Sequence, residues 1–246
     1  MAVVEKTIDI LGDVLFSASI IERGMREGYP VDIYDEAITA LRNGALYGMR
    51  NVESVNFPNV ISIGNNALYG CSQLKRARFP AATSMGGGGI RECPLLEEVN
   101  APLLPSIGEY AFANDNSLVT ISLPSLLSTG TSPFFSCTHL RNVVFPKLRT
   151  TGSNTFYGCT ALEQVDLPSI VTLGGGMFQY CSALEVVNIG PSIASISATA
   201  FINAPAGLVI NLPVAEGAIS GAPWSAPNAV INYEVPYAGT VPIPED

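Results

Sequence analysis

Residues 65–80 read NNALYGCSQLKRARFP and residues 153–168 read SNTFYGCTALEQVDLP, and the two stretches align position for position. In both, a tyrosine, a glycine and a cysteine precede a leucine, and polar and apolar residues then alternate up to a proline. The same proline recurs every 22 residues, at Pro58, Pro80, Pro102, Pro124, Pro146 and Pro168, and after one inserted residue at Pro191 and Pro213. A period this regular indicates a repeat architecture.

Three further columns keep the 22-residue register and are almost wholly apolar. They are Leu46, Leu68, Ile90, Phe112, Phe134, Phe156 and Phe178; Val52, Leu74, Leu96, Leu118, Leu140, Leu162 and Leu184; and Val55, Ala77, Val99, Ile121, Val143, Val165 and Val187. One repeat cannot bury these side chains alone, so the repeats must stack and share one core.

Each repeat predicts a short strand, a second extended segment and a turn. The alternation ends at a proline, which cannot donate to a strand ladder. The column Gly64, Gly86, Gly108, Gly130, Gly152 and Gly174 marks a corner, and we expect one helical turn after it. The predicted fold class is therefore a mostly β, leucine-rich-repeat-like solenoid of about eight rungs, with strands about 4.8 Å apart in a parallel sheet.

The rungs NALYGCSQLKRARFP (66–80), NTFYGCTALEQVDLP (154–168) and GMFQYCSALEVVNIG (176–190) resemble BspA-type leucine-rich repeats, over about residues 31–213. Such repeats occur in bacterial and protozoan surface proteins and in phage virion proteins. The resemblance implies a non-enzymatic structural or binding protein, first a bacteriophage virion component such as a tail, fibre or decoration protein. The alternative that it implies is a bacterial cell-surface adhesin domain. The matching residues are core residues, so they indicate the fold and not the ligand.

The composition excludes several classes of protein. Hydrophobic residues make up 48% of the 246 residues and charged residues only 13%, against roughly a quarter charged in a typical domain. The net charge of −9 argues against nucleic acid as a partner. The uncharged stretch from Val14 to Ile21 is too short to span a membrane. Because Asp9 and Asp13 interrupt the position of an apolar signal core, we expect no Sec signal in this sequence.

The chain divides into three predicted parts. Residues 1–30 carry an N-terminal segment with a capping helix over about 13–27, which begins at Asp13 and ends before Gly28 and Pro30. Residues 31–213 form the solenoid, with a first strand over 31–34. Residues 214–246 form a C-terminal cap and a proline-rich tail, in which Trp224 closes the core and residues 230–233 make the last strand. We expect the tail to be extended and to contact another molecule.

Five cysteines occupy one column of the repeat: Cys71, Cys93, Cys137, Cys159 and Cys181. Side chains in register point in parallel, which suits neither a disulfide nor a zinc site. We expect free, buried thiols. Asp115 replaces cysteine in this column and either accepts hydrogen bonds from backbone amides or belongs to a cation site with Asn114 and Asn116, although carboxylates are too few for a calcium loop.

The sequence predicts no catalytic residue, no metal site and no cofactor. The glycine run 86–89 lacks the G-K-[ST] of a phosphate-binding loop and aligns with the glycines 174–176, so we interpret it as a corner. His139 is the only histidine and stands at a variable position beside Leu140. A Ser-His-Asp triad needs a histidine held by a carboxylate, and the repeat pattern provides none.

Function on a solenoid lies on the residues that vary between repeats. The outward strand positions and the turn aromatics define the candidate interaction surface: Tyr47, Tyr69, Phe135, Tyr157, Arg76, Arg78, Asn100, Asn142 and Gln164. We expect ion pairs of Arg76 with Glu98 and of Lys75 with Glu53 and Glu97. The turn aromatics either fold back against the glycine corner or line an interface.

Protein or a cell-surface glycan is the expected partner, with a homo-oligomer or virion assembly as further possibilities. The expected location is the virion, or alternatively the bacterial cell surface.

Overall fold

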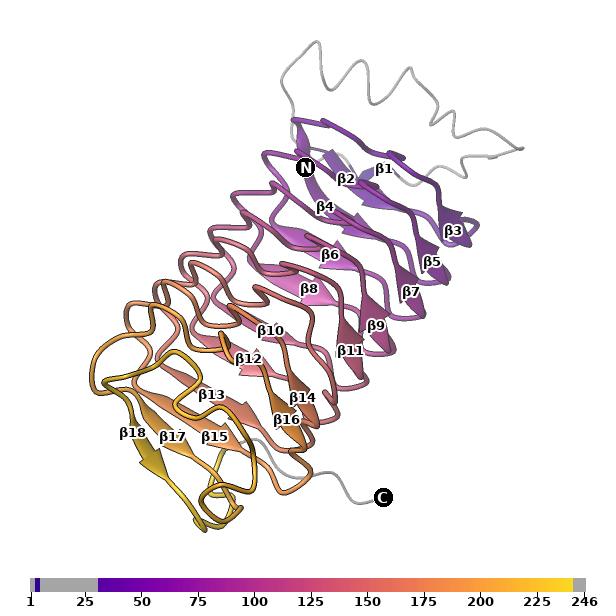
Figure 1. Cartoon of the computed structure of the whole chain (residues 1–246). Helices are drawn as coiled ribbons and strands as arrows, with labels where there is room; N and C mark the ends of the chain where they lie inside the picture. Colours follow the sequence, from indigo (N-terminus) through magenta and orange to yellow (C-terminus); the bar gives the residue numbers. More distant parts are fainter. Residues whose placement is uncertain (1–2, 5–30, 241–246) are drawn as a thin grey trace.

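The computed structural model describes residues 3–4 and 31–240, which form an elongated stack of similar rungs (Figure 1). One face carries a row of parallel strands that pair at the predicted spacing; Arg76, for example, pairs with Ser54 on one side and Glu98 on the other. The strands on this face are β1 (Val3–Val4), β2 (Val31–Tyr34), β4 (Val52–Asn56), β6 (Arg76–Arg78), β8 (Glu98–Asn100), β10 (Thr120–Ser122), β12 (Asn142–Val144), β13 (Gln164–Leu167), β15 (Val186–Ile189), β17 (Val209–Asn211) and β18 (Val230–Asn232).

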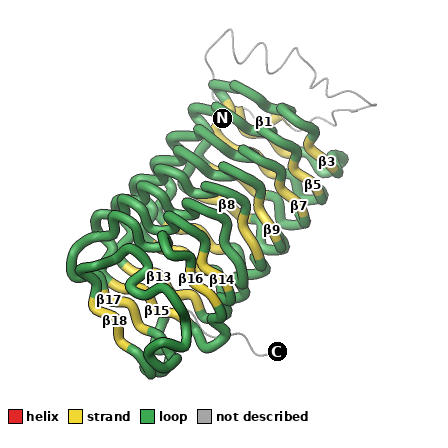
Figure 2. Tube along the Cα trace, in the orientation of Figure 1, coloured by secondary structure: helices red, strands yellow, loops and turns green. Residues whose placement is uncertain are grey.

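A second row of shorter parallel strands follows the proline of each rung. Isolated bridges through Thr150 continue this row between β11 and β14. Its strands are β3 (Ala40–Leu41), β5 (Ser62–Ile63), β7 (Ser84–Met85), β9 (Ser106–Ile107), β11 (Ser128–Thr129), β14 (Thr172–Leu173) and β16 (Ser195–Ile196). The two rows enclose the core between them, and the solenoid has about nine turns (Figure 2).

The core is built from the predicted columns. Phe112, Phe134, Phe156, Phe178 and Phe201 are buried and follow one another in stacked contact, with ring centroids 5.3 to 5.9 Å apart. The stack ends on Trp224, which is fully buried 6.4 Å from Phe201 and donates its indole N–H to the Ser220 carbonyl. Trp224 therefore closes the core as the sequence predicts.

The glycine column marks the closest approach of neighbouring rungs. A Cβ atom on Gly152 would lie 2.2 Å from the carbonyl oxygen of Gly130, and one on Gly174 would lie 2.3 Å from that of Gly152. No side chain fits at such a distance, so glycine is required here by the backbone above it. The corner interpretation of the glycine runs is confirmed at these positions.

The third side of each rung differs from the prediction of a helical turn. No helix is found in residues 3–4 and 31–240, and this side, the turn edge, is loop in Figure 2. Its backbone alternates between bonds to the next rung, such as Leu46 N–H to Ala67, and bonds three residues back, such as Tyr47 N–H to Gly44.

Two positions per rung, four residues apart, take positive φ along the turn edge. The first series is Gly44, Asn66, Gly88, Tyr110, Ser132, Asn154 and Gly176, and the second is Gly48, Gly70, Glu92, Asn114, Ser136, Gly158 and Tyr180. A left-handed residue at every fourth position interrupts a right-handed helix. With this alternation, every second backbone N–H of the turn edge donates a hydrogen bond to a carbonyl oxygen of the neighbouring rung.

The cysteine ladder is buried and its thiols are free. Each thiol donates to the carbonyl oxygen of the residue 25 positions earlier, in the preceding rung, at 2.9 to 3.2 Å. Burial raises the pKa of Cys93, Cys137 and Cys159 well above the usual value, and that of Cys181 to about 12. The prediction of buried structural thiols is confirmed.

Asp115 follows the backbone-amide alternative. It is fully buried, and its Oδ1 accepts a hydrogen bond from the Cys93 N–H at 2.8 Å. Its Oδ2 is buried and has no hydrogen-bond partner within the described residues. Burial raises the pKa of Asp115 well above the usual carboxyl range, which favours the protonated form at this position.

Two predictions at the N-terminus meet different outcomes. The strand predicted at 31–34 is present as β2, and Ile33 pairs with Val55 as the register requires. The capping helix over about 13–27 lies outside the described residues. The pairing of Val3 and Val4 with Asp32 and Ile33 adds a strand that the repeat pattern does not predict.

Candidate functional site

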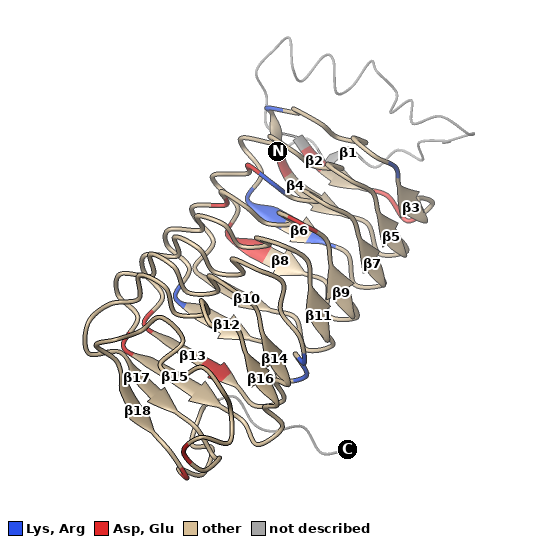
Figure 3. Ribbon diagram, in the orientation of Figure 1, with Lys and Arg blue, Asp and Glu red and all other residues tan. Residues whose placement is uncertain are grey.

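The outward face of the long strands divides into a charged part and an uncharged part. Lysine, arginine and acidic residues gather on β2, β4, β6 and β8, whereas β15, β17 and β18 carry none (Figure 3). Arg76 and Arg78, both predicted surface residues, lie here on β6. This part of the face suits charged contacts, although exposed pairs contribute only about 0.2–1 kcal/mol each.

The ion pairs follow a diagonal that the sequence does not predict. Arg78, and not Arg76, pairs with Glu98, at 2.9 Å between Nη2 and Oε1. Arg76 instead approaches Asp32 at 3.8 Å, two rungs away on the other side. Lys75 pairs with Glu53 at 3.3 Å, as expected, whereas the expected Lys75–Glu97 pair does not occur among the described residues. The expected Arg76–Glu98 pair is therefore wrong, because long arginine side chains reach past their direct neighbours.

The other part of the face carries a directional ladder of side-chain amides. Asn188 Nδ2 donates to Asp166 Oδ1, Asn211 donates to Asn188, and Asn232 donates to Asn211, all at 2.7 to 2.8 Å. Asp166 is buried, and it also accepts a bond from Gln164 Nε2 at 2.9 Å. The ladder fixes the register of the last strands.

The C-terminal segment returns over this ladder. Thr240 donates both its backbone N–H and its hydroxyl to Asp166 Oδ2, each at 2.6 Å. Burial alone would raise the pKa of Asp166, but the bonds from Thr240, Asn188 and Gln164 outweigh it and lower that pKa. Residues 234–240, the strap, are thus attached at Thr240 to this chain's own carboxylate, and a contact of the tail with another molecule stays a prediction.

A groove opens where the strap ends. It has a volume of about 440 Å³ and lies over β12 and the start of β13. It brings together the predicted residues Asn142 and Gln164, whereas Asn100 lies two rungs away on β8. Its lining is Arg141, Asn142, Val143, Val144, Glu163, Gln164, Asp166 and Thr240.

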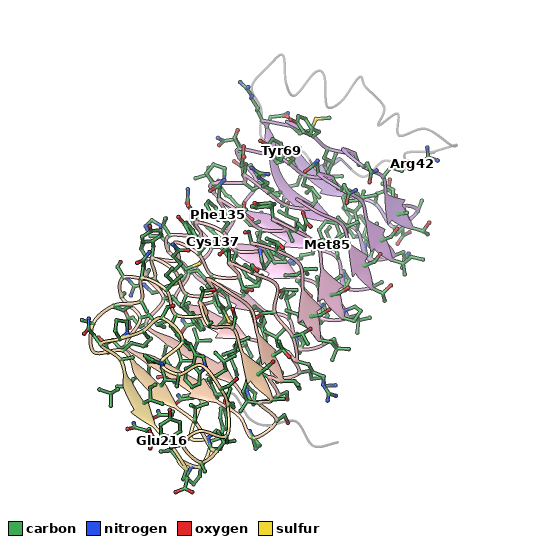
Figure 4. All side chains as sticks on the ribbon, viewed as in Figure 1. Arg42, Tyr69, Met85, Phe135, Cys137 and Glu216 are labelled. Carbon is green, nitrogen blue, oxygen red and sulfur yellow. The ribbon has the colours of Figure 1, made fainter. Side chains whose placement is uncertain are left out.

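The turn edge carries the aromatic candidates. Tyr47 stacks on Tyr69 with ring centroids 4.9 Å apart, and Phe135 stacks on Tyr157 at 4.7 Å. Tyr69 and Phe135 lie along the same edge of the solenoid in Figure 4, whereas Arg42 lies at the opposite edge. Tyr47 is 59% exposed. The rings therefore stack on one another along the edge, and Tyr47 does not fold back against the glycine corner.

An arginine occupies the first of the two rungs between these pairs. The Arg91 guanidinium carbon lies 5.5 Å from the ring centroid of Tyr69 and 5.1 Å from that of Tyr110. Arg91 also pairs with Glu92 at 3.2 Å, and Glu92 accepts a hydrogen bond from the Tyr69 hydroxyl, which raises the pKa of Tyr69. Sequence reasoning missed Arg91 because it appears as a single basic residue in an aromatic column.

The described residues offer little to a catalytic mechanism. No group of three or more His, Cys, Asp or Glu side chains that could hold a metal ion occurs among residues 3–4 and 31–240. The exposed His139 contacts the Thr138 hydroxyl at 3.3 Å. No helix in the same part of the chain is long and apolar enough to cross a membrane.

The stacked parallel rungs, with one buried apolar column after another, define a leucine-rich repeat solenoid. The family model of the BspA type leucine rich repeat region matches residues 31–103 and 83–206 with six copies, and the chain belongs to this family. This is a family of surface and binding proteins. No curated protein matches this sequence.

A solved structure with a TM-score above 0.5 shares this fold, and two further leucine-rich repeat structures are similar at lower scores. A leucine-rich repeat protein from Bacteroides ovatus is 19% identical, with a TM-score of 0.58; the match covers 85% of this chain and 62% of that protein. A leucine rich repeat protein of T. pallidum is 20% identical over 81% of this chain and 79% of that one, with a TM-score of 0.48. A leucine rich cell surface protein from Faecalibacterium prausnitzii is 18% identical over 80% and 83%, with a TM-score of 0.45.

Proposed function

We propose that this chain is a non-enzymatic attachment protein that presents its solenoid at the surface of a larger particle or cell. The observation that carries the proposal is the aromatic series on the turn edge, in which Tyr47, Tyr110 and Tyr180 are exposed and the other rings half-buried, beside a face of polar ladders. Exposed aromatic side chains on a rigid scaffold are typical anchors of interfaces. Family membership supports the same class of function.

The first setting that we propose is a bacteriophage virion, in which the chain would be a tail, fibre or decoration protein that binds protein or glycan. The second is a bacterial cell surface, where the same surfaces would serve an adhesin domain. The resemblance of the rungs supports both settings equally, and the binding chemistry is shared.

Locating the chain tests the proposal. Antibodies against the purified chain would be applied to phage particles and to intact cells of the source, with detection by gold labelling and mass spectrometry. Recovery in particles supports the virion, and labelling of intact cells supports the adhesin. Recovery only in the soluble interior of cells, with no bound partner, would contradict an attachment function.

A further inference from the structure

The ring series on the turn edge is continuous because residues from neighbouring columns fill its gaps. The column of Tyr47, Tyr69, Phe135 and Tyr157 holds Arg91, Ala113 and Gln179 in its other three rungs. At Ala113 the gap is filled by Tyr110, whose ring lies 6.3 Å from Phe135 and beneath Arg91. At Gln179 it is filled by Tyr180, whose ring lies 5.2 Å from Tyr157. We call this series, from Tyr47 to Tyr180 and including Arg91, the aromatic ridge.

The two filling tyrosines occupy strained positions. Tyr110 has a φ of 52° and Tyr180 a φ of 62°, in columns where most other rungs place glycine, asparagine or serine. A bulky side chain is disfavoured in this left-handed region, and such strain concentrates at functional sites. Both tyrosines occur in rungs whose ridge column lacks an aromatic or planar cationic side chain. The coincidence favours a requirement for an unbroken ridge.

The half of the ridge from Phe135 to Tyr180 carries no formal charge. The turn-edge stretches 131–139, 153–161 and 175–183 contain no Asp, Glu, Lys or Arg, although the chain has a net charge of −9. Exposed polar groups around these rings come instead from Ser, Thr, Asn and Gln. Tyrosine with Ser, Gly and Asn is the composition of antibody paratopes, and depletion of charge marks the centre of protein interfaces.

The ring geometry distinguishes a protein partner from a glycan. Phe135 has Tyr157 stacked on one side and Tyr110 edge-on at the other, and Tyr157 lies between Phe135 and Tyr180. Because Phe135 and Tyr157 stack face to face at 4.7 Å, each covers one face of the other, and a sugar, which stacks on a ring face, finds fewer open faces here. Ring edges are partly positive and phenol hydroxyls donate hydrogen bonds, so they complement carbonyl-rich, uncharged surface.

We propose that the uncharged half of the aromatic ridge, centred on Phe135, Tyr157 and Tyr180, docks a partner protein through an uncharged surface rich in peptide carbonyls. This inference rests on the proposed attachment function and names the partner class and the contact residues. Tyr180 is the outermost anchor, at 49% exposed. Because neither this half of the ridge nor the proposed partner surface carries charge, the affinity of the complex should depend little on ionic strength.

Displayed peptides provide the probe. The full chain would be used to select binders from a random phage-displayed peptide library, and the recovered peptides would be synthesised and titrated by calorimetry. The test variants are Tyr157→Ser and Tyr180→Gly. The matched control is Tyr34→Ser, which removes an exposed tyrosine from the strand face, 44% exposed and away from the ridge. Circular dichroism would confirm that each variant is folded.

We expect the dominant peptides to bind at least tenfold more weakly to each test variant and to bind Tyr34→Ser as they bind the unaltered chain. Their affinity should also stay constant between about 0.01 and 1 M salt, a range over which interactions between surface charges become screened. Peptides that bind both test variants undiminished, or no recovered binder, would overturn the inference. An array of neutral glycans would be probed in parallel. If the chain binds a glycan and the same variants lose that binding, the assignment of a protein partner is wrong. The proposed attachment function would still stand, because only the localisation experiment above can contradict it.

Discussion

At the scale of single residues, the five cysteines and Asp115 of the cysteine column each form a hydrogen bond with a backbone group of the preceding rung. The thiols do so as weak donors to carbonyl oxygens, and Asp115 does so as an acceptor for the Cys93 N–H. A sequence pattern can identify this column as buried. It cannot decide whether an aspartate there is an acceptor, a proton carrier or a ligand, because that depends on atoms from the neighbouring rung.

The raised pKa of Asp115 makes stability depend on pH. The folded chain retains a proton on Asp115 that the unfolded chain releases, so the free energy of unfolding should fall as the pH rises above the ordinary carboxyl pKa. The loss is up to about 1.4 kcal/mol per pH unit until the folded pKa is reached. Urea unfolding between about pH 4 and 8 would measure this. Asp115→Asn should remove that share of the pH dependence, and an unchanged profile in the variant would show that Asp115 is not the group concerned.

The thiol ladder predicts chemical inertness. With five buried free cysteines and with burial raising the pKa of four of them, the folded chain should react negligibly with a thiol reagent such as dithionitrobenzoate. All five should react after unfolding in guanidinium. Fast, stoichiometric labelling of any one thiol under native conditions would contradict its placement in the core.

At the scale of the elements, the glycine corner tests how tightly the rungs are stacked. Gly152→Ala would force a methyl group against the Gly130 carbonyl, so we expect it to lower the free energy of unfolding by about 2 kcal/mol or more. The neighbouring exposed Ser153→Ala should change it by less than about 0.5 kcal/mol. Denaturant unfolding measures both, and equal stability of the two variants would mean that the corner is looser than the structure shows.

The strap should depend on the charge of Asp166. Its lowered pKa means that the contribution of the carboxylate is present above the unfolded carboxyl pKa and is lost as the pH falls through the folded pKa in acid. Asp166→Asn removes the charge-assisted acceptor for Thr240, a bond of about 1.5–3 kcal/mol. Hydrogen exchange should then show the Thr240 amide losing protection at pH 7. Retained protection in the variant would assign the strap's position to other contacts.

The sequence predicts the strands, the corner and the core because these repeat with the period, and in-register stacking repeats each contact. It mispredicts the turn edge as a helical turn, since alternating left-handed residues leave only a weak excess of Gly, Asn and Ser at two columns. The strap could not be foreseen, because residues 214–240 leave the period and Asp166 appears as one more outward position. Tyr110 and Tyr180 escaped the candidate surface because they stand outside the aromatic column.

At the scale of the whole molecule, the solenoid separates stability from recognition. Stability comes from the core columns, the corner and the amide ladder, each of which joins only neighbouring rungs. We propose that recognition takes place on the turn edge, where Tyr110 and Tyr180 hold conformations that glycine would adopt without strain. Left-handed backbone costs a non-glycine residue about 1–2 kcal/mol. If the ridge serves binding, the chain tolerates the strain at Tyr110 and Tyr180 because binding requires their rings.

The unfolding free energy of the Tyr110→Gly, Tyr180→Gly double variant tests this claim most directly. The measurement is denaturant unfolding beside the unaltered chain and Asn154→Gly, which changes the same left-handed column without removing a ring. Relief of strain should offset the lost ring contacts, so we expect the double variant to be at least as stable as the unaltered chain. A loss of more than about 2 kcal/mol would contradict it, because the tyrosines would then be structural parts of the fold.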